Sequence, residues 1–273
     1  MSNKTIAFIG TGNMSYAIIG GLINSGFSKD HIIATNRNEQ KLAKVHDDFQ
    51  IRTTNDNLKA IEQADFIVLS VKPQMMEALC KTFVDANVDY KDKVFISVAA
   101  GIQVSRLQEM LAHPVKMVRC MPNTPSLVGK GVSGLFSNNT SEDEKQFVTD
   151  VFSATGIAIW LDTESQINDI IAVTGSSPAY LFAFYEAIET KAIALGFSPQ
   201  QARQLVEQVA QGAGQMIAES ADLPISQSRA NVTSKGGTTA AAIAHFQQQG
   251  LNTLVADAMD ACINRAQQME LEF

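Results

Sequence analysis

The sequence predicts an α/β protein in which a domain built on a parallel sheet is followed by an all-α domain. In the first part of the 273 residues, short apolar runs alternate with helical stretches, which is the order typical of parallel strands joined by right-handed crossovers. From Glu164 onward there is no convincing strand pattern, and helical stretches fill the chain. We therefore expect a sheet domain over residues 1–162 and a helical domain over residues 163–273.

The predicted strands of the first domain are apolar runs without polar alternation. Such strands are typical of a sheet that is covered by helices on both faces. They lie at residues 5–10, 31–35, 66–71, 94–99 and 115–119, with a further candidate at 131–136. Helical patterns between them lie at 14–25, 38–49, 57–63, 74–84 and 103–112.

The predicted helices of the second domain are rich in small residues and have clear start and stop signals. They cover residues 164–173, 178–195, 199–219, 226–229, 238–248 and 251–270. Ser198 is a good N-cap before Pro199, and Gly196 and Gly250 are plausible helix stops. Small residues let helices approach closely, which fits either a self-contained bundle or an interface between subunits. The sequence leaves both interpretations open.

Composition excludes several classes of partner. The formal net charge is −7 and there is no long Lys/Arg run, so binding to nucleic acid or to an anionic membrane is not expected. The N-terminal residues show no signal-peptide pattern, and no apolar stretch is long enough for a membrane span, so we expect a cytoplasmic protein. Cys80, Cys120 and Cys262 are far apart and odd in number, as in reduced intracellular thiols. The four histidines lack metal-ligand spacing, so no metal site is expected.

The turn after the first strand carries the pattern G-x-G-x-x-S from Gly10 to Ser15. Gly10 permits a tight turn, Gly12 permits close approach of a pyrophosphate, and the following helix N-terminus favours phosphate. A lone pattern of this kind can be an incidental turn. Here it follows the first strand and opens a helix, so it predicts a Rossmann-type site for a nicotinamide cofactor. The expected contacts are Ile9, Gly10, Thr11, Gly12, Asn13 and Met14.

The end of the second strand indicates which nicotinamide cofactor is bound. An NAD site usually places an acidic residue here to hold the ribose 2′-hydroxyl, but Thr35 is followed by Asn36 and Arg37. An arginine suits a 2′-phosphate. We therefore expect a preference for NADP(H), with NAD(H) as the alternative. In the competing interpretation, Arg37 is a solvated surface charge.

Two later strand ends are expected to face the same crevice, because ligands bind outside the carboxyl ends of parallel strands. One is Val71-Lys72-Pro73 and the other is Ala99-Ala100-Gly101. Small residues at the second turn would let a nicotinamide ring lie against the backbone. Lys72 has three interpretations, a catalytic acid, a cofactor contact or a solvated lysine, and its position favours the cofactor contact.

The most unusual stretch of the helical half is the Ser/Gly/Thr loop at residues 231–240, which leads into a helix that begins near Thr238. Consecutive N–H groups at a helix N-terminus form an anion site for a phosphate or a carboxylate. Every helix start also needs a cap, so a capped start without a ligand is an equally good interpretation.

Several motifs in the expected order resemble the pyrroline-5-carboxylate reductase family over essentially the whole chain. The motifs are IGTGNM near the start, VKPQ at 71–74, VAAGI at 98–102, VRCMPNTP at 118–125, AVTGSSPAY at 172–180 and VTSKGGTTAAAIAHF at 232–246. The resemblance implies NADPH- or NADH-dependent reduction of 1-pyrroline-5-carboxylate to L-proline, by hydride transfer to C5 of the cyclic imine. It also implies that the helical domain forms an intertwined homodimer, with a decamer of five dimers as a further assembly.

The resemblance also implies roles for individual residues. Thr239 would be the catalytic hydroxyl near the ring nitrogen, and the substrate contacts would be Asn231, Val232, Gly236, Gly237, Thr238 and Thr239. Cofactor contacts would include Asn36, Asn57, Val71, Lys72, Ala99 and Ala100, next to Arg37 and Pro73, with Glu164 as a ligand-site acid. Several relatives have Ser-Pro in place of Asn36-Arg37, so the family by itself does not decide between NADP and NAD.

Two other functions remain open. One is that of another imine or 2-hydroxyacid reductase on the same two-domain plan. A hydroxyacid dehydrogenase of that plan would need a Lys or His base in its helical half, and neither Lys191 nor Lys235 lies in a recognisable pattern. A protein that only senses NADP would not need the loop at 231–240. Mixing the protein with NADPH and pyrroline-5-carboxylate separates these functions, because a sensor binds NADPH without turnover.

Overall fold

The computed structural model describes residues 4–273. Two compact units make up the chain, and we call them the sheet unit and the helical unit. The sheet unit comprises the residues up to Ser176 together with Cys262–Phe273, and the helical unit comprises Ser177–Ala261. The last helix is shared between them, since its C-terminal end belongs to the sheet unit.

The sheet has eight strands in the order β3-β2-β1-β4-β5-β6-β7-β8. All neighbours are parallel except β6 and β7, which are antiparallel. The strands are β1 (Ile6–Ile9), β2 (Ile32–Thr35), β3 (Arg52–Thr54), β4 (Phe66–Leu69), β5 (Val94–Ser97), β6 (Lys116–Met121), β7 (Gly131–Phe136) and β8 (Gly156–Trp160). The order reverses between β1 and β4, so the connections diverge at the carboxyl ends of these two strands.

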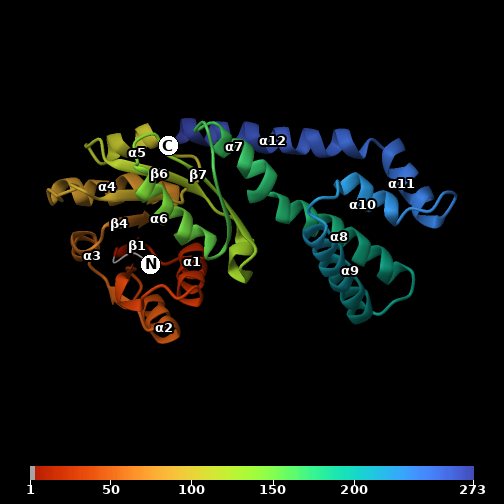
Figure 1. Ribbon diagram of the computed structural model, residues 1–273, viewed down its shortest axis with the longest axis horizontal. Coiled ribbons are helices and arrows are strands. Elements are labelled where there is room, and N and C mark those ends of the chain that lie inside the picture. Colours follow the sequence, from red (N-terminus) through yellow and green to blue (C-terminus); the bar gives the residue numbers. More distant parts are fainter. Residues whose placement is uncertain (1–3) are drawn as a thin grey trace. The chain divides into compact units, whose positions relative to one another are not determined.

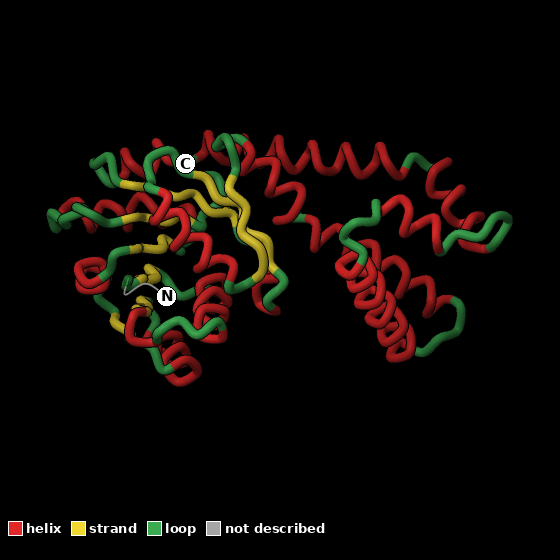
Figure 2. Tube along the Cα trace, viewed as in Figure 1, coloured by secondary structure: helices red, strands yellow, loops and turns green. Residues whose placement is uncertain are grey.

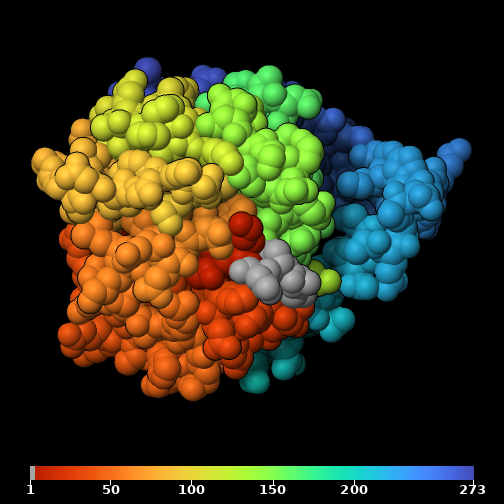
Figure 3. Space-filling view, turned by 60° about the vertical axis from the view of Figure 1, so that its left-hand side comes forward, coloured from red at the N-terminus to blue at the C-terminus, as the bar shows by residue number. Residues whose placement is uncertain are grey.

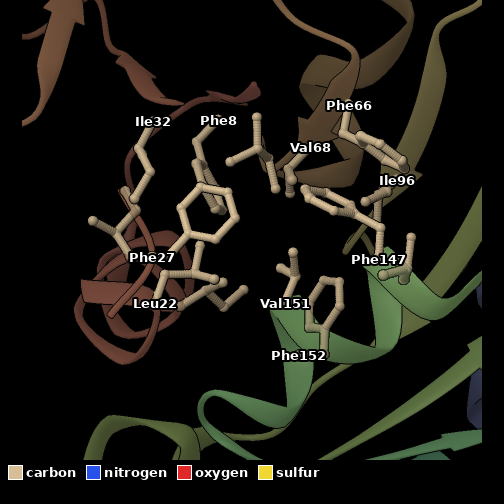
Figure 4. Packing of buried hydrophobic residues seen from close by; sticks show 14 of the residues in the cluster. Phe8, Leu22, Phe27, Ile32, Phe66, Val68, Ile96, Phe147, Val151 and Phe152 are labelled. Carbon is tan, nitrogen blue, oxygen red and sulfur yellow. The ribbon is translucent and has the colours of Figure 1, made fainter. Parts of the chain in front are cut away.

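Helices cover both faces of the sheet, as the apolar strands predict. Every residue of β1, β2, β4 and β5 is buried. Because successive side chains of a strand point to opposite faces, Phe8 and Ala7 belong to two different core clusters. The first cluster, drawn in Figure 4, packs Phe8 and Val68 against Leu22 of one helix and Phe147 of another. Burial of each large side chain of this kind contributes roughly 1.5–3 kcal/mol.

The helices of the sheet unit divide between these two faces (Figure 1). Residues of α1, α2 and α6 contribute to the first cluster, and residues of α3, α4 and α5 contribute to the second. Figure 2 shows the strands in yellow with these helices in red, and Figure 3 shows the segments of this unit as closely packed atoms. The bounds are α1 (Asn13–Asn24), α2 (Glu39–Phe49), α3 (Asn57–Gln63), α4 (Met76–Asp85), α5 (Val104–Met110), α6 (Glu142–Ser153) and α7 (Gln166–Ile170).

The helical unit contains long helices whose ends agree with the sequence signals. They are α8 (Ser177–Ala194), α9 (Pro199–Glu219), α10 (Ile225–Asn231), α11 (Thr238–Gln248) and α12 (Leu251–Glu272). Ser198 caps α9 in a capping box with Gln201. The predicted stops at Gly196 and Gly250 adopt φ values of 102° and 76°. These values lie in the left-handed region that favours glycine after a helix.

The structure adds three elements that the sequence pattern did not indicate. β3 has no apolar run, whereas β8 is an apolar run whose residues alternate between half-buried and exposed. Helix α6 begins with a capping box between Ser141 and Glu144, which was a usable sequence signal. The expectation of parallel strands fails for one pair only: β7 is parallel to β8 but antiparallel to β6, because a short connection with one 3₁₀ segment joins β6 to β7. A parallel return needs a much longer crossover.

The compact units do not follow a single cut at residue 162, since residues 163–176 and the C-terminal end of α12 pack with the sheet. The division into domains at 162/163 stays a prediction.

All three cysteines are free, and burial raises the pKa of the Cys80 thiol to about 12. No helix within residues 4–273 is both long enough and apolar enough to cross a membrane.

Candidate cofactor and substrate sites

A cavity of about 290 Å³ lies where the strand order reverses. Its walls come from the carboxyl ends of β1, β2 and β4, which is where doubly wound sheets bind their ligands. A larger cavity of about 420 Å³ lies beside α1 and α6, but no strand-end residue and no cationic side chain lines it. The strand-end cavity is therefore the candidate cofactor site of the sheet unit.

The glycine turn is shaped by two different requirements. Gly10 has φ of 95°, and a Cβ there would lie 3.0 Å from the main-chain oxygen of Ser70. A Cβ at Gly12 would meet nothing within 4 Å, so the space in front of α1 is open. Gly12 is the N-cap of α1 and no side chain caps this helix. Its first N–H groups are therefore available to an anion such as a pyrophosphate.

The third position of the glycine pattern, Ser15, has a structural role. Its side chain is fully buried, and its Oγ donates a hydrogen bond to the main-chain oxygen of Gly10 at 2.9 Å. The Ser15 hydroxyl therefore connects the first turn of α1 to the glycine turn that precedes it. Serine at this position is compatible with the dinucleotide-binding turn.

A polar network connects the first two strand ends. The Oγ1 of Thr11 donates to the main-chain oxygen of Thr35 at 2.9 Å, and the Oγ1 of Thr35 donates to Oδ1 of Asn57 at 2.6 Å. The Nδ2 of Asn36 donates to the main-chain oxygen of Thr11 at 3.2 Å. These bonds hold Asn36 and Asn57 in the cavity wall, where the sequence predicted cofactor contacts.

Three cationic side chains line the cavity, namely Arg37, Lys41 and Lys72. All three are exposed, and their side chains form no hydrogen bond or ion pair with the part of the chain that the structure describes. Lys44, one turn further along α2, differs because its Nζ lies 2.6 Å from Oδ2 of Asp48. The hydrogen bond from Lys44 lowers the pKa of Asp48. The cavity thus has unneutralised positive charge at its rim.

Sequence reasoning missed Lys41. It lies four residues after Arg37 and two residues into α2, so the helix start brings it to the same wall. A lysine at this spacing was a usable signal, because the N-terminal turn of the helix after the second strand faces the crevice. Thr35, Ser70, Met75 and Leu79 also line the cavity and were not predicted.

The structure brings together most of the predicted cofactor residues. Those in the cavity wall are Ile9, Gly10, Thr11, Gly12, Asn36, Arg37, Asn57, Val71 and Lys72. Asn13 lines an adjoining cavity that shares Thr11, Gly12 and Lys41 with the first. The remaining predicted residues do not line the strand-end cavity, and they are Met14, Pro73, Ala99, Ala100 and Glu164.

The turn that contains Ala99 and Ala100 follows β5, the strand next to β4. Ala99 is buried, and its N–H donates to Oγ of Ser97 at 3.3 Å. Gly101, which follows, has φ of 76°. A nicotinamide contact at this turn stays a prediction.

Glu164 occupies a different kind of position. Its Oε1 accepts hydrogen bonds from the main-chain N–H of Val104 at 2.7 Å and from Nη1 of Arg119 at 3.2 Å. These contacts connect it to the start of α5 and to a buried arginine of β6. Its cofactor contact stays a prediction.

In the helical unit, the loop after α10 leads directly into α11. Gly236 has φ of 74°, and Gly237 is the N-cap of α11 without a side-chain cap. Thr238 and Thr239, the first two residues of α11, are exposed. The first N–H groups of α11 therefore lack a protein side chain as an acceptor, which is the condition for binding a carboxylate. Asn231 and Val232 are also exposed.

Comparison with known proteins covers both units. A family model described as pyrroline-5-carboxylate reductase dimerisation matches residues 164–269, and one described as NADP oxidoreductase, coenzyme F420-dependent, matches residues 5–101. A pyrroline-5-carboxylate reductase of Vibrio alginolyticus is 47% identical over the full length of both chains. The structure of one from Coxiella burnetii has a TM-score of 0.92 at 36% identity, covering 98% of this chain and 99% of the other. The Plasmodium falciparum pyrroline carboxylate reductase with NADP bound has a TM-score of 0.85 at 27% identity, covering 99% of both chains.

Proposed function

The chain belongs to the pyrroline-5-carboxylate reductase family, and from this membership we propose that it reduces 1-pyrroline-5-carboxylate to L-proline, the last step of proline biosynthesis. A nicotinamide cofactor supplies the hydride, which is added to C5 of the cyclic imine. The observation that carries the proposal is the similarity to these reductases over the full length of the chain. It is accompanied by a cavity at the strand ends, next to the N-terminus of α1, which no side chain caps. The direct test is proline formation from the imine and NADPH.

The strand-end cavity is the proposed cofactor site. The N–H groups of α1 would hold the pyrophosphate, while Asn36 and Asn57 would contact the ribose next to β2. Arg37 and Lys41 at the rim favour NADP(H), because both carry charge that can bind a 2′-phosphate, and NAD(H) is the alternative. Val71, Lys72 and Pro73 would line the path toward the nicotinamide, which would lie against Ala99 and Ala100. Met14 and Glu164 complete the proposed set.

Arg37→Ala should weaken NADPH binding by about 10- to 100-fold and leave NADH binding nearly unchanged, because one charge-assisted hydrogen bond contributes about 1.5–3 kcal/mol. Lys41→Ala should act in the same direction. The measurement is the Kd of each cofactor by calorimetry. Lys44→Ala is the matched control on the same helix, since Asp48 already neutralises Lys44. If Arg37→Ala and Lys41→Ala weakened the binding of NADPH and NADH by the same factor, these side chains would not recognise the 2′-phosphate.

The start of α11 is the proposed substrate site. The main-chain N–H groups of Gly236 and Thr238 would receive the substrate carboxylate, with Asn231 and Val232 beside it. Gly237 would line the same turn, while its N–H donates to the main-chain oxygen of Ser234 at 3.0 Å. A protonated imine is already a strong electrophile, so the reaction needs orientation more than a strong acid. Thr239 would hydrogen-bond the ring nitrogen and stabilise the amine as it forms.

Thr239→Ala should lower kcat/KM by about 10²-fold, because it removes a hydrogen bond that strengthens in the transition state. NADPH affinity should stay unchanged, and Thr239→Ser should restore most of the activity. Thr238→Ala is the control, since it keeps the proposed main-chain donor. Steady-state kinetics with both substrates varied gives these values. Wild-type kcat/KM for Thr239→Ala would remove Thr239 from the mechanism.

The helical unit is the proposed dimerisation surface. In the part of the chain that the structure describes, helices α8, α10 and α11 contain no buried residue. Large apolar side chains of α8 are therefore exposed, and the exposed fractions of Phe182 and Leu181 are 68% and 53%. Apolar surface of this extent is typical of helices that a second subunit covers. The match to the family's dimerisation model supports a homodimer through these helices. A decamer of five dimers and a cytoplasmic location complete the proposal.

A further inference from the structure

Arg119 of β6 is a buried charge with two carboxylate partners. Its side chain is 1% exposed. Its Nη1 lies 3.2 Å from Oε1 of Glu164, and its Nη2 lies 2.8 Å from Oε1 of Glu270 near the end of α12. An arginine so deeply buried requires paired carboxylates, since an isolated buried charge is strongly destabilising. The ion pair between Arg119 and Glu270 therefore attaches the end of α12 to the sheet.

The same two carboxylates also hold the turn between β5 and α5. Glu164 accepts the main-chain N–H of Val104 through the oxygen that contacts Arg119. Glu270 accepts Nε2 of Gln103 at 3.0 Å through its second oxygen. Each carboxylate thus connects the buried arginine to one of two successive residues at the end of this turn. None of these contacts involves the strand-end cavity, so they contribute nothing directly to dinucleotide binding.

The turn packs closely against the end of α12, and Figure 1 shows the C-terminus of the chain beside α5. A Cβ at Gly101 would lie 2.9 Å from Cβ of Met269 and 3.3 Å from Cδ2 of Phe273, so only a glycine leaves room for the helix end. The Nε of Arg106 donates to the main-chain oxygen of Phe273 at 2.7 Å. Phe273 also packs against the core cluster that contains Ala99.

We propose that the end of α12 is a clamp that positions the β5–α5 turn, with Glu270 as the positioning residue and Met269 and Phe273 as its packing surface. The proposal rests on the proposed function, in which the nicotinamide lies against Ala99 and Ala100 of this turn. Charge contacts at Gln103 and Val104 and close packing at Gly101 fix the turn from its C-terminal side. Glu270 therefore acts on hydride transfer through the turn, without touching cofactor or substrate.

The variant Glu270→Gln tests the clamp, because it removes the charge and keeps the size of the side chain. We expect kcat to fall by about 10- to 100-fold, since misplacement by 1 Å can cost about 10²-fold in rate. The isotope effect on kcat, measured with NADPH deuterated at the transferred position, should rise. The Kd of 2′-phospho-ADP-ribose, which lacks the nicotinamide, should stay within about twofold of the wild-type value because its cavity is untouched. Glu270→Asp should restore part of kcat.

Glu272→Gln is the matched control. It removes the same charge two residues further on, where Glu272 pairs only with the exposed Arg265 among residues 4–273, and it should leave kcat unchanged. Met269→Ala tests packing without a change in charge and should lower kcat while keeping the Kd of the probe. An unchanged kcat and isotope effect for folded Glu270→Gln would overturn the clamp. The clamp would also be overturned if Glu270→Gln lost as much affinity for 2′-phospho-ADP-ribose as it lost in kcat. That result would mean that Glu270 supports the structure of the sheet unit in general rather than the position of the turn.

The proposed function can fail independently of the clamp. If the proposed function is wrong, the wild-type protein does not reduce the imine, but the fluorescence of bound NADPH still reports on the surroundings of the nicotinamide. If the clamp nevertheless exists, Glu270→Gln changes this fluorescence and Glu272→Gln does not. Identical spectra for both variants would contradict the clamp whatever the substrate is.

Discussion

Gly10→Ala is expected to weaken NADPH binding by about 10- to 100-fold. A non-glycine residue in the left-handed region costs about 1–3 kcal/mol, and each 1.4 kcal/mol corresponds to a tenfold change in affinity. Gly10 has φ of 95°, and an added Cβ would lie 3.0 Å from the oxygen of Ser70 and 3.2 Å from Cγ1 of Val71. To relieve both, the turn has to move away from β4, which changes the cavity wall. Calorimetric titration with NADPH measures the effect.

Gly26→Ala is the control for this substitution. Gly26 has φ of 85° in the turn after α1, but an added Cβ there would meet nothing within 4 Å. The control should lose about 1 kcal/mol of folding stability and bind NADPH with wild-type affinity. If Gly10→Ala binds NADPH as tightly as Gly26→Ala does, the Gly10 turn does not form the cofactor site.

Arg119→Met should lower the free energy of unfolding by about 3–5 kcal/mol, the usual cost of removing one partner from a buried ion pair. Methionine fills much of the same space, so the main effect is electrostatic. Glu270, whose side chain is only 11% exposed, would lose its cation, and Glu164 would keep only its bond from Val104. Urea unfolding followed by circular dichroism gives the value.

The triple variant Arg119→Met/Glu164→Gln/Glu270→Gln separates charge from packing. Neutral amides no longer need the arginine, so the triple variant should recover a large part of the lost stability. Arg265→Met, which breaks an exposed pair with Glu272, should change stability by less than about 1 kcal/mol. A triple variant as unstable as the sum of its single substitutions would show that the charges are not coupled.

The apolar strands and the glycine turn made the sheet unit predictable. Runs such as Phe66–Leu69 are buried on both faces, so their composition indicates a covered strand directly. The helix starts at Pro199 and Thr238 follow local capping and loop signals, and both agree with the structure. The cavity wall was predictable for the same reason, since each of its strands ends in a recognisable turn.

The missed features depend on contacts that are distant in the sequence. β3 has no apolar run, and only pairing with β2 defines it. The antiparallel pairing of β7 depends on the length of one connection rather than on its residues. Glu270 and Arg119 are 151 positions apart, and no local pattern joins them. Glu164 was predicted as a ligand-site acid, and its contacts with Val104 and Arg119 became evident only in three dimensions.

Reductase activity is tested by mixing the purified protein with NADPH and 1-pyrroline-5-carboxylate and following both the NADPH absorbance and the proline formed. One proline should form for each NADPH oxidised, and the reaction should be faster with NADPH than with NADH at equal subsaturating concentrations. Binding of NADPH without its oxidation in the presence of the imine would contradict the proposed reductase activity.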